Sequence, residues 1–355
     1  MNILQNIFIN HYEELIYLTH PRPSVVENVD KMINCGDPSF GGAMYAIDRT
    51  TSMSFKLINC SHRHCVFTIP EELRNFFLED RTLLNCLFSS VRSVVLRMFH
   101  KENKSELFTP GFICVLHTFG RSLQWNPHIH CLISEGGIGN SSSWRTFKHF
   151  NYTFLRNAFC TALLNELEAK IGSSFKAVKA YIYKNCIEGF YIYAKPALCR
   201  PREVTKYIGR YLGRPVIATK HIDKNDGKNV TFHYNRHEDD ELVVETVTAL
   251  EFMQLLVQHI PEKHFKMIRY YGIYARHRKQ DSKLYRAIPK EKHRILLSFN
   301  KWRNAILSSF GYDPLECLCC KNTMSVLEIY YKHKRVSLQE LYERTRSKHS
   351  IRPPA

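Results

Sequence analysis

The chain has 355 residues, 44% of them hydrophobic, so it has room for two or three compact units with buried cores, and wholesale disorder is excluded. Its 50 Lys and Arg against 33 Asp and Glu give a formal net charge of +17, which predicts a polyanionic partner, with nucleic acid ahead of an anionic membrane. The sequence has no run of eighteen apolar residues and no basic signal-like start, so we expect a cytoplasmic protein with no membrane span and with its twelve cysteines reduced.

Residues 1–59 are predicted to form a helical N-terminal region. Apolar periodicity marks one helical stretch from His11 to Tyr17 and a second from Val25 to Ile33. From Cys35 to Asn59 the pattern becomes irregular, with two adjacent glycines and a Ser/Thr-rich run, which indicates a loop or weakly ordered connector.

Residues 60–222 are predicted to form an α+β domain. Strand-like runs and helical stretches follow one another in the order strand, helix, strand, strand, helix, strand, helix. This order is typical of a split βαβ, ferredoxin-like antiparallel sheet with flanking helices. The predicted elements are strand 64–69, helix 71–100, strands 112–117 and 127–133, helix 152–171, strand 189–194 and helix 202–212.

The remainder is predicted to be a mixed C-terminal region, made of an extension over 223–310 and a module with a basic tail over 311–355. A hairpin is expected to pair 216–222 with 229–236, followed by helices over 252–259 and 291–309. In the last module, Cys317 and Cys320 form a Cys-x-x-Cys pair. A structural zinc needs four ligands and no second pair follows, so this candidate zinc pair would need ligands from elsewhere.

Two histidines in Asn126-Pro127-His128-Ile129-His130 form the first candidate site. Residues i and i+2 of a strand point to the same face, so His128 and His130 can chelate a divalent ion together, although such a pair also occurs as a structural or surface feature. His117 lies near the end of the neighbouring predicted strand, and hairpin pairing would bring it beside them. We therefore predict a metal site of His128, His130 and His117, with Glu203 as a rival third ligand.

Two tyrosines one helical turn apart, Tyr207 and Tyr211, form the second candidate site. They share one face of the predicted helix 202–212, where an aromatic packing pair is the structural alternative. The neighbouring cations Lys206, Arg210 and Arg214 suit a phosphate and lower the cost of a phenolate. A metal would polarise a scissile phosphate, and one tyrosine would attack it and hold the 5′ end as a phosphotyrosine.

A third set of residues is expected to contact DNA. Between 266 and 279 the sequence interleaves cations and rings, including Arg269, Tyr270, Tyr271 and Arg276, a pattern that suits single-stranded bases and their phosphates. A buried aromatic helix with a basic exposed face explains the same pattern. Arg121, in the predicted turn before the histidine pair, is included in the DNA-binding set.

At these residues the chain resembles the HUH superfamily of single-strand nucleases, named for two histidines flanking a hydrophobic residue, and more closely the two-tyrosine transposases of the IS91 family. The resemblance covers nearly everything from residue 60 to 325. The blocks that carry it are 62–74, 117–121, 125–130, 206–211 with Arg214-Pro215, 265–272 and 311–315.

The resemblance implies the HUH endonuclease sheet, with Mg²⁺ or Mn²⁺ on His128 and His130 and with Tyr207 and Tyr211 as the nucleophiles. It also implies nicking and joining of single-stranded insertion-sequence ends and target DNA in rolling-circle-like transposition. Besides DNA, a second copy of the chain is a candidate partner.

The sequence departs from this family before the His62-Arg63-His64 block. Relatives usually carry a zinc-binding region of several paired cysteines there, whereas here only Cys35-Gly36 matches its start and no further cysteine occurs up to Asn59. Cys60, Cys65, His62 and His64 have no recognisable zinc-finger spacing. We therefore expect a truncated zinc region, and two alternatives stay open: a catalytically inactive single-stranded DNA-binding protein, and a metallohydrolase of a small phosphodiester whose tyrosines merely pack.

Overall fold

The computed structural model describes most of the first three quarters of the chain. The described residues are 2–34, 60–101, 108–139, 144–147, 149–199, 216–236 and 239–275, together with 307, 313, 316, 329–331 and 334–336. The predicted connector 35–59, the predicted helix 202–212, nearly all of the predicted helix 291–309 and the cysteine module lie outside them.

The centre of the fold is a six-stranded antiparallel sheet. Its strands lie in the order β5-β1-β3-β2-β9, and the short β4 pairs with β3. Apart from the short β4, the strands β1, β2, β3 and β5 are connected as predicted, strand-helix-strand-strand-helix-strand, so the α+β prediction is confirmed. The bounds are β1 His62–Phe67, β2 Thr109–Phe119, β3 Trp125–Ile138, β4 Arg145–Thr146, β5 Ile192–Cys199 and β9 Ile268–Gly272.

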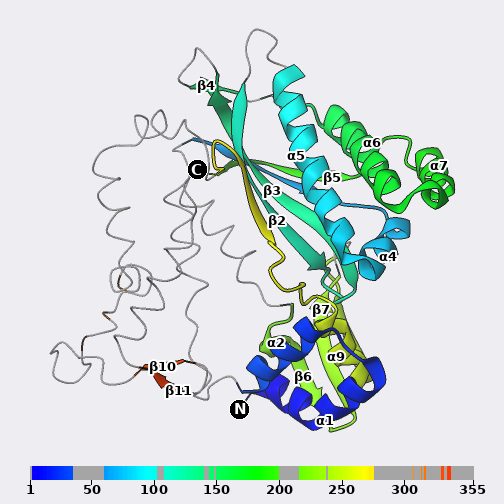
Figure 1. Ribbon diagram of the computed structural model, residues 1–355, viewed down its shortest axis with the longest axis vertical. Coiled ribbons are helices and arrows are strands. Elements are labelled where there is room, and N and C mark those ends of the chain that lie inside the picture. Colours follow the sequence, from blue (N-terminus) through cyan, green and yellow to red (C-terminus); the bar gives the residue numbers. More distant parts are fainter. Residues whose placement is uncertain are drawn as a thin grey trace.

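Four helices lie on one side of this sheet, three of them against its strands and the last one beside the preceding helix (Figure 1). They are α4 (Glu71–Glu79), α5 (Leu84–Lys101), α6 (Tyr152–Ile171) and α7 (Lys176–Asn185), and two 3-10 turns, Arg81–Leu83 and Ser173–Phe175, precede α5 and α7. The apolar stripe of α5 is fully buried, which is the expected driving force for packing a helix on a sheet. The segment Arg81–Lys101 is long and apolar enough to cross a membrane, but its burial is that of a core helix.

The prediction of a single helix over 71–100 is wrong in one detail, because the helix is interrupted at Asp80. The Asp80 carboxylate accepts hydrogen bonds from the backbone N–H and the hydroxyl of Thr82, at 2.8 and 2.6 Å. This local capping competes with a continuous helix, so α4 ends at Glu79 and a 3-10 turn leads into α5.

A second core joins the N-terminal helices to residues more than 180 positions later. Helices α1 (Ile3–Thr19) and α2 (Pro23–Ile33) pack on a three-stranded sheet of β6 (Ile222–Asn225), β7 (Asn229–Asn235) and β8 (Leu242–Thr248), and on α9 (Ala249–Val257) (Figure 1). A 3-10 turn, Thr219–His221, precedes β6. The predicted helical lead-in is confirmed. A hairpin does turn at Asn225-Asp226-Gly227, but its first strand is Ile222–Asn225, so the strand predicted over 216–222 is wrong.

Several elements differ from the sequence prediction. Strand β5 begins three residues later than expected, because Gly189 has a φ of +75° in the turn that precedes it. Helix α7 and strands β8 and β9 were not predicted, and β9 extends the main sheet with residues from beyond 222. Within the tail, β10 (Ile329–Tyr331) pairs with β11 (Lys334–Val336).

Candidate metal centre

Strand pairing brings three histidines together on the main sheet. His117 of β2 is the direct cross-strand partner of His128 of β3, and His130 lies two residues further along the same face. Their ligand nitrogens all lie within 4.8 Å of one another. The sequence neighbours of these histidines, Leu116, Ile129 and Cys131, are in the core under the helices, so the histidines occupy the opposite face. The predicted trio therefore converges, whereas Glu203 lies outside the described residues.

Hydrogen bonds fix the orientation of His128. Its Nδ1 lies 2.7 Å from the carbonyl oxygen of Asn126, which can only accept, so Nδ1 carries the proton. The Nε2 lone pair of His128 then points to Nε2 of His130, 3.0 Å away. A cation between these two nitrogens would take a lone pair from each, which is the arrangement that a metal pair requires.

A fourth histidine, His64, supports this group from the neighbouring strand β1. Its Nε2 lies 3.0 Å from Nδ1 of His130, and the two rings stack with centroids 5.2 Å apart and planes 8° apart. When His130 presents its Nε2 lone pair to a metal, its Nδ1–H donates to His64. The sequence places His64 in a family block, but only the register, in which His130 pairs with Val66, shows this contact.

The surroundings of His128 favour its neutral imidazole. Burial lowers the pKa of His128, and the positive charge of Arg74 lowers it further. Arg74 is partly buried, and its Nε has no hydrogen-bond partner among the described residues. A neutral His128 is ready to ligate, and Arg74 is a cation near it that sequence reasoning did not single out.

The donor set fits a divalent cation. Three neutral imidazoles suit first-row transition ions, whereas Mg²⁺ is ordinarily held by carboxylates and water. Of the two ions expected from the sequence, Mn²⁺ is therefore the better match. With three protein ligands, coordination positions remain for a substrate oxygen or water.

Most other predicted site residues lie outside the described residues: Tyr207, Tyr211, Lys206, Arg210, Arg214, Arg276, Cys317 and Cys320. Of the four residues weighed as a zinc finger, Cys65 lies in β1 and is buried in the core under the helices, and burial raises the pKa of its thiol to about 12, which makes it a poor metal ligand. His62 donates to or accepts from the Tyr274 hydroxyl at 2.6 Å. Cys65 and His62 thus have separate surroundings in the described fold.

The expected DNA contacts are divided between the two faces of the sheet. Arg269 and Tyr271 lie on the helix side, where the Arg269 guanidinium covers the Phe88 ring at 4.0 Å and Tyr271 stacks on Phe112. Tyr270 pairs in register with Ile113 and packs on the opposite, histidine side. Residues 268–272 form a strand and not the buried helix that was the structural alternative, so alternate residues lie on opposite faces.

Arg121 also has a defined structural setting. Its guanidinium donates to the backbone carbonyls of Asn235 and Arg236 and forms an ion pair with Asp240 at 2.9 Å. These bonds join the turn between β2 and β3 to the small sheet.

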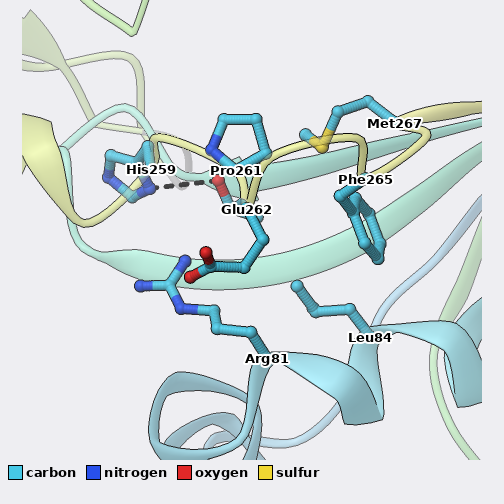
Figure 2. Close-up of a pocket in the computed structure, with 8 residues that line it drawn as sticks. Arg81, Leu84, His259, Pro261, Glu262, Phe265 and Met267 are labelled. Carbon is cyan, nitrogen blue, oxygen red and sulfur yellow. Dashed lines mark hydrogen bonds between the residues drawn. The ribbon is translucent and has the colours of Figure 1, made fainter. Parts of the chain in front are cut away.

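A small pocket lies on the helix side of the sheet, away from the histidine trio (Figure 2). Arg81, Leu84, Phe265 and Met267 line it together with His259, which is held by the Thr118 hydroxyl at 3.1 Å. Burial lowers the pKa of His259 to about 4. Glu262 also lines the pocket, and among the described residues no group of three metal-ligating side chains lies there.

Two models of known protein families match the chain. A family model described as "Transposase zinc-binding domain" matches residues 7–67, and one described as "Putative transposase" matches residues 111–281. Together they take in more than half of the chain, and the second includes the histidine trio and the two tyrosines. The chain is thus of the transposase class, and it belongs to the IS91 family.

Two curated relatives of the chain are also described as transposases. The chain is 28% identical over 238 residues to the "Transposase for insertion sequence element IS801" of Pseudomonas savastanoi pv. phaseolicola, covering 63% of this chain and 57% of that protein. It is 28% identical over 246 residues to "Putative transposase y4qJ" of Sinorhizobium fredii, covering 63% of this chain and 61% of that protein. The chain thus spans about three fifths of the length of these relatives. No solved structure matches it significantly.

Proposed function

We propose that the protein is a transposase that nicks and joins single-stranded DNA at the ends of an insertion sequence. The observation that carries this proposal is the convergence of His117, His128 and His130 on one face of the sheet, in a chain of the IS91 family. Its partners are the single-stranded ends and the target DNA, with a second copy as a further partner. Its place is the cytoplasm, on the nucleoid when DNA is bound.

The chemistry is a transesterification at phosphorus. The hydroxyl oxygen of Tyr207 or Tyr211 attacks the scissile phosphate, the new O–P bond holds the 5′ end, and the bond to the 3′ oxygen breaks. The tyrosine proton goes to solvent or a base, and the departing 3′ oxygen ends as a hydroxyl. A divalent cation on the histidines supplies Lewis-acid polarisation of the phosphate. The second tyrosine serves the next transfer in a rolling-circle-like sequence.

The described residues have positioning and electrostatic roles. The Asn126 carbonyl holds His128 in the tautomer that presents Nε2, and His64 would accept the Nδ1 proton of a His130 that binds the cation through Nε2. Arg74 supplies positive charge beside His128, where a phosphate would bring negative charge. Cys317 and Cys320 remain a proposed structural zinc pair, and a truncated zinc region before residue 60 remains a proposal.

A denaturing gel tests this function. The full chain is incubated with a labelled single-stranded end oligonucleotide and Mn²⁺, and a covalent protein–DNA band is expected in the wild type. Tyr207→Phe or Tyr211→Phe should weaken the band, and His128→Ala should abolish it. Retention of DNA in a native gel without any covalent band would leave only an inactive DNA-binding protein. Cleavage of a small diester with both tyrosines replaced would contradict the phosphotyrosine mechanism.

A further inference from the structure

A second histidine pair lies in the small sheet, on separate elements from the trio. His221 ends the 3-10 turn before β6, and His233 lies on β7. Nδ1 of His221 and Nε2 of His233 are 3.1 Å apart, and both side chains are partly exposed. No match to a known protein assigns this pair a role.

The internal geometry of this pair closely repeats that of His128 and His130. The ring centroids are 4.9 Å apart in both pairs, with planes at 67° for His221 and His233 and 62° for His128 and His130. The facing nitrogens are 3.1 Å apart in the first pair and 3.0 Å in the second. Ligand nitrogens about 2.0–2.1 Å from a tetrahedral ion lie a little over 3 Å apart, so either pair can share one cation.

A carboxylate fixes the tautomer of His233. Asp223 approaches Nδ1 of His233 with both oxygens, at 2.7 and 2.9 Å, so this nitrogen donates its proton. The Nε2 lone pair then points to His221. A carboxylate on the far nitrogen is the usual support of a metal-bound histidine, because it orients the ring and raises its basicity.

The strand register explains how the three side chains meet. The pairing of β6 with β7 shifts between Ile222 and Lys224, which makes Asp223 the extra residue of a bulge. A bulge redirects a side chain locally, and here it puts the carboxylate on the outer face beside His233. Phe232, the neighbour of His233, faces the core instead.

We propose that His221 and His233 bind a divalent first-row transition cation, with Asp223 orienting His233, at a site separate from the trio. Imidazole nitrogens select ions such as Zn²⁺ or Ni²⁺ over Mg²⁺. The cation links the turn before β6 to β7 and so fastens the small sheet. A hydrogen-bonded chain from Asp223 to His221 without a cation is the competing explanation.

Calorimetric titration with Ni²⁺ distinguishes these explanations. The tag-free full chain carries His128→Ala, His130→Ala, Cys317→Ser and Cys320→Ser, so that the histidine trio and the C-terminal cysteine pair no longer bind the ion. This background should bind one more equivalent of Ni²⁺ than the same protein with His233→Ala. Asp223→Asn should weaken that site about 10- to 100-fold. His11→Ala is the matched control, since His11 also faces a carboxylate, Glu14, at 3.2 Å, and it should leave binding unchanged.

Thermal unfolding gives a second readout. Saturating Ni²⁺ should raise the Tm of the background protein and leave that of the His233→Ala version unchanged, because a cation that binds only the folded state stabilises it. Equal binding and equal Tm shifts in the two proteins would overturn the proposal. If the multiple variant does not fold, the wild type and His221→Ala are compared instead, with a difference of one equivalent expected and equal stoichiometry overturning the site.

Discussion

His64 is a residue whose role can be isolated from that of the metal ligands themselves. Because its Nε2 accepts the Nδ1 proton of His130 when Nε2 of His130 binds a cation, His64→Ala should loosen His130 and weaken Mn²⁺ binding about 10- to 100-fold. Calorimetry measures the affinity. His64→Gln retains a side-chain acceptor and should recover part of the loss. Unchanged affinity in both variants would show that His64 merely packs on His130.

His259 gives the fold a defined pH dependence. Burial lowers its pKa to about 4 in the folded state, against a usual 6.5, so the unfolded chain binds the proton more readily between these values. The contribution of neutral His259 to the free energy of unfolding is therefore fully present above about pH 6.5. It is lost as the pH falls toward 4, and the full loss is about 3 kcal/mol. Urea unfolding at pH 7 and pH 5 should show a smaller loss in His259→Gln than in the wild type.

The exposed His149→Gln is the control for this measurement. Equal pH dependence in the wild type and His259→Gln would contradict the assignment of the effect to His259.

For single residues, the sequence predicted that the three histidines converge, but it did not predict which side chains surround them. Alternation along β3 and hairpin pairing with β2 suffice to place His117, His128 and His130 together. The contact of His64 depends on the register between β1 and β3, which no local pattern specifies. For Arg269 and Tyr270, strand parity was not considered, because a helix was the only structural alternative weighed for that segment; their roles in DNA binding stay predictions.

At the element scale, the attachment of β9 depends on a glycine. Gly272 has a φ of +60°, and a Cβ there would lie 1.8 Å from the Pro110 carbonyl oxygen. Gly272→Ala therefore combines left-handed strain with a clash that must move β9 from β2. It should lower the free energy of unfolding by about 1–3 kcal/mol more than a Gly→Ala change at a positive φ where the added Cβ meets no other atom.

Gly227→Ala supplies that comparison, since Gly227 has a φ of +91° with nothing within 4 Å of an added Cβ. Chemical denaturation measures both variants. An equal loss of stability would mean that the contact between Gly272 and Pro110 does not restrain the strand.

The element order of the main sheet was predictable because each element has a clear period. Buried strands appear as short apolar runs, and α5 and α6 carry long helical stripes. Strand β9 was missed because five residues with an aromatic and basic composition show no alternation of apolar and polar residues. The packing of α1 and α2 on β6–β8 is long-range, and no local signal specifies it.

At the scale of the whole molecule, the charge of +17 predicts salt-sensitive binding to single-stranded DNA. The logarithm of the association constant should fall linearly with the logarithm of the salt concentration. Arg74→Gln should make this slope shallower by roughly 0.7 if Arg74 contacts one phosphate. Fluorescence anisotropy with a labelled oligonucleotide measures the slope.

Arg269→Gln is the matched control, because Arg269 is held over Phe88 on the helix side. An unchanged slope in Arg74→Gln, or a shallower one in Arg269→Gln, would contradict the placement of the DNA on the histidine face.

Peptide mapping by mass spectrometry of the protein–DNA adduct formed with Mn²⁺ tests whether the histidine trio and the tyrosine pair make one DNA-cleaving site. The nucleotide is expected on the peptide that contains Tyr207 and Tyr211 in the wild type, and on no peptide in the His128→Ala, His130→Ala variant. An adduct on another residue, or one that forms equally without the histidines, would contradict it.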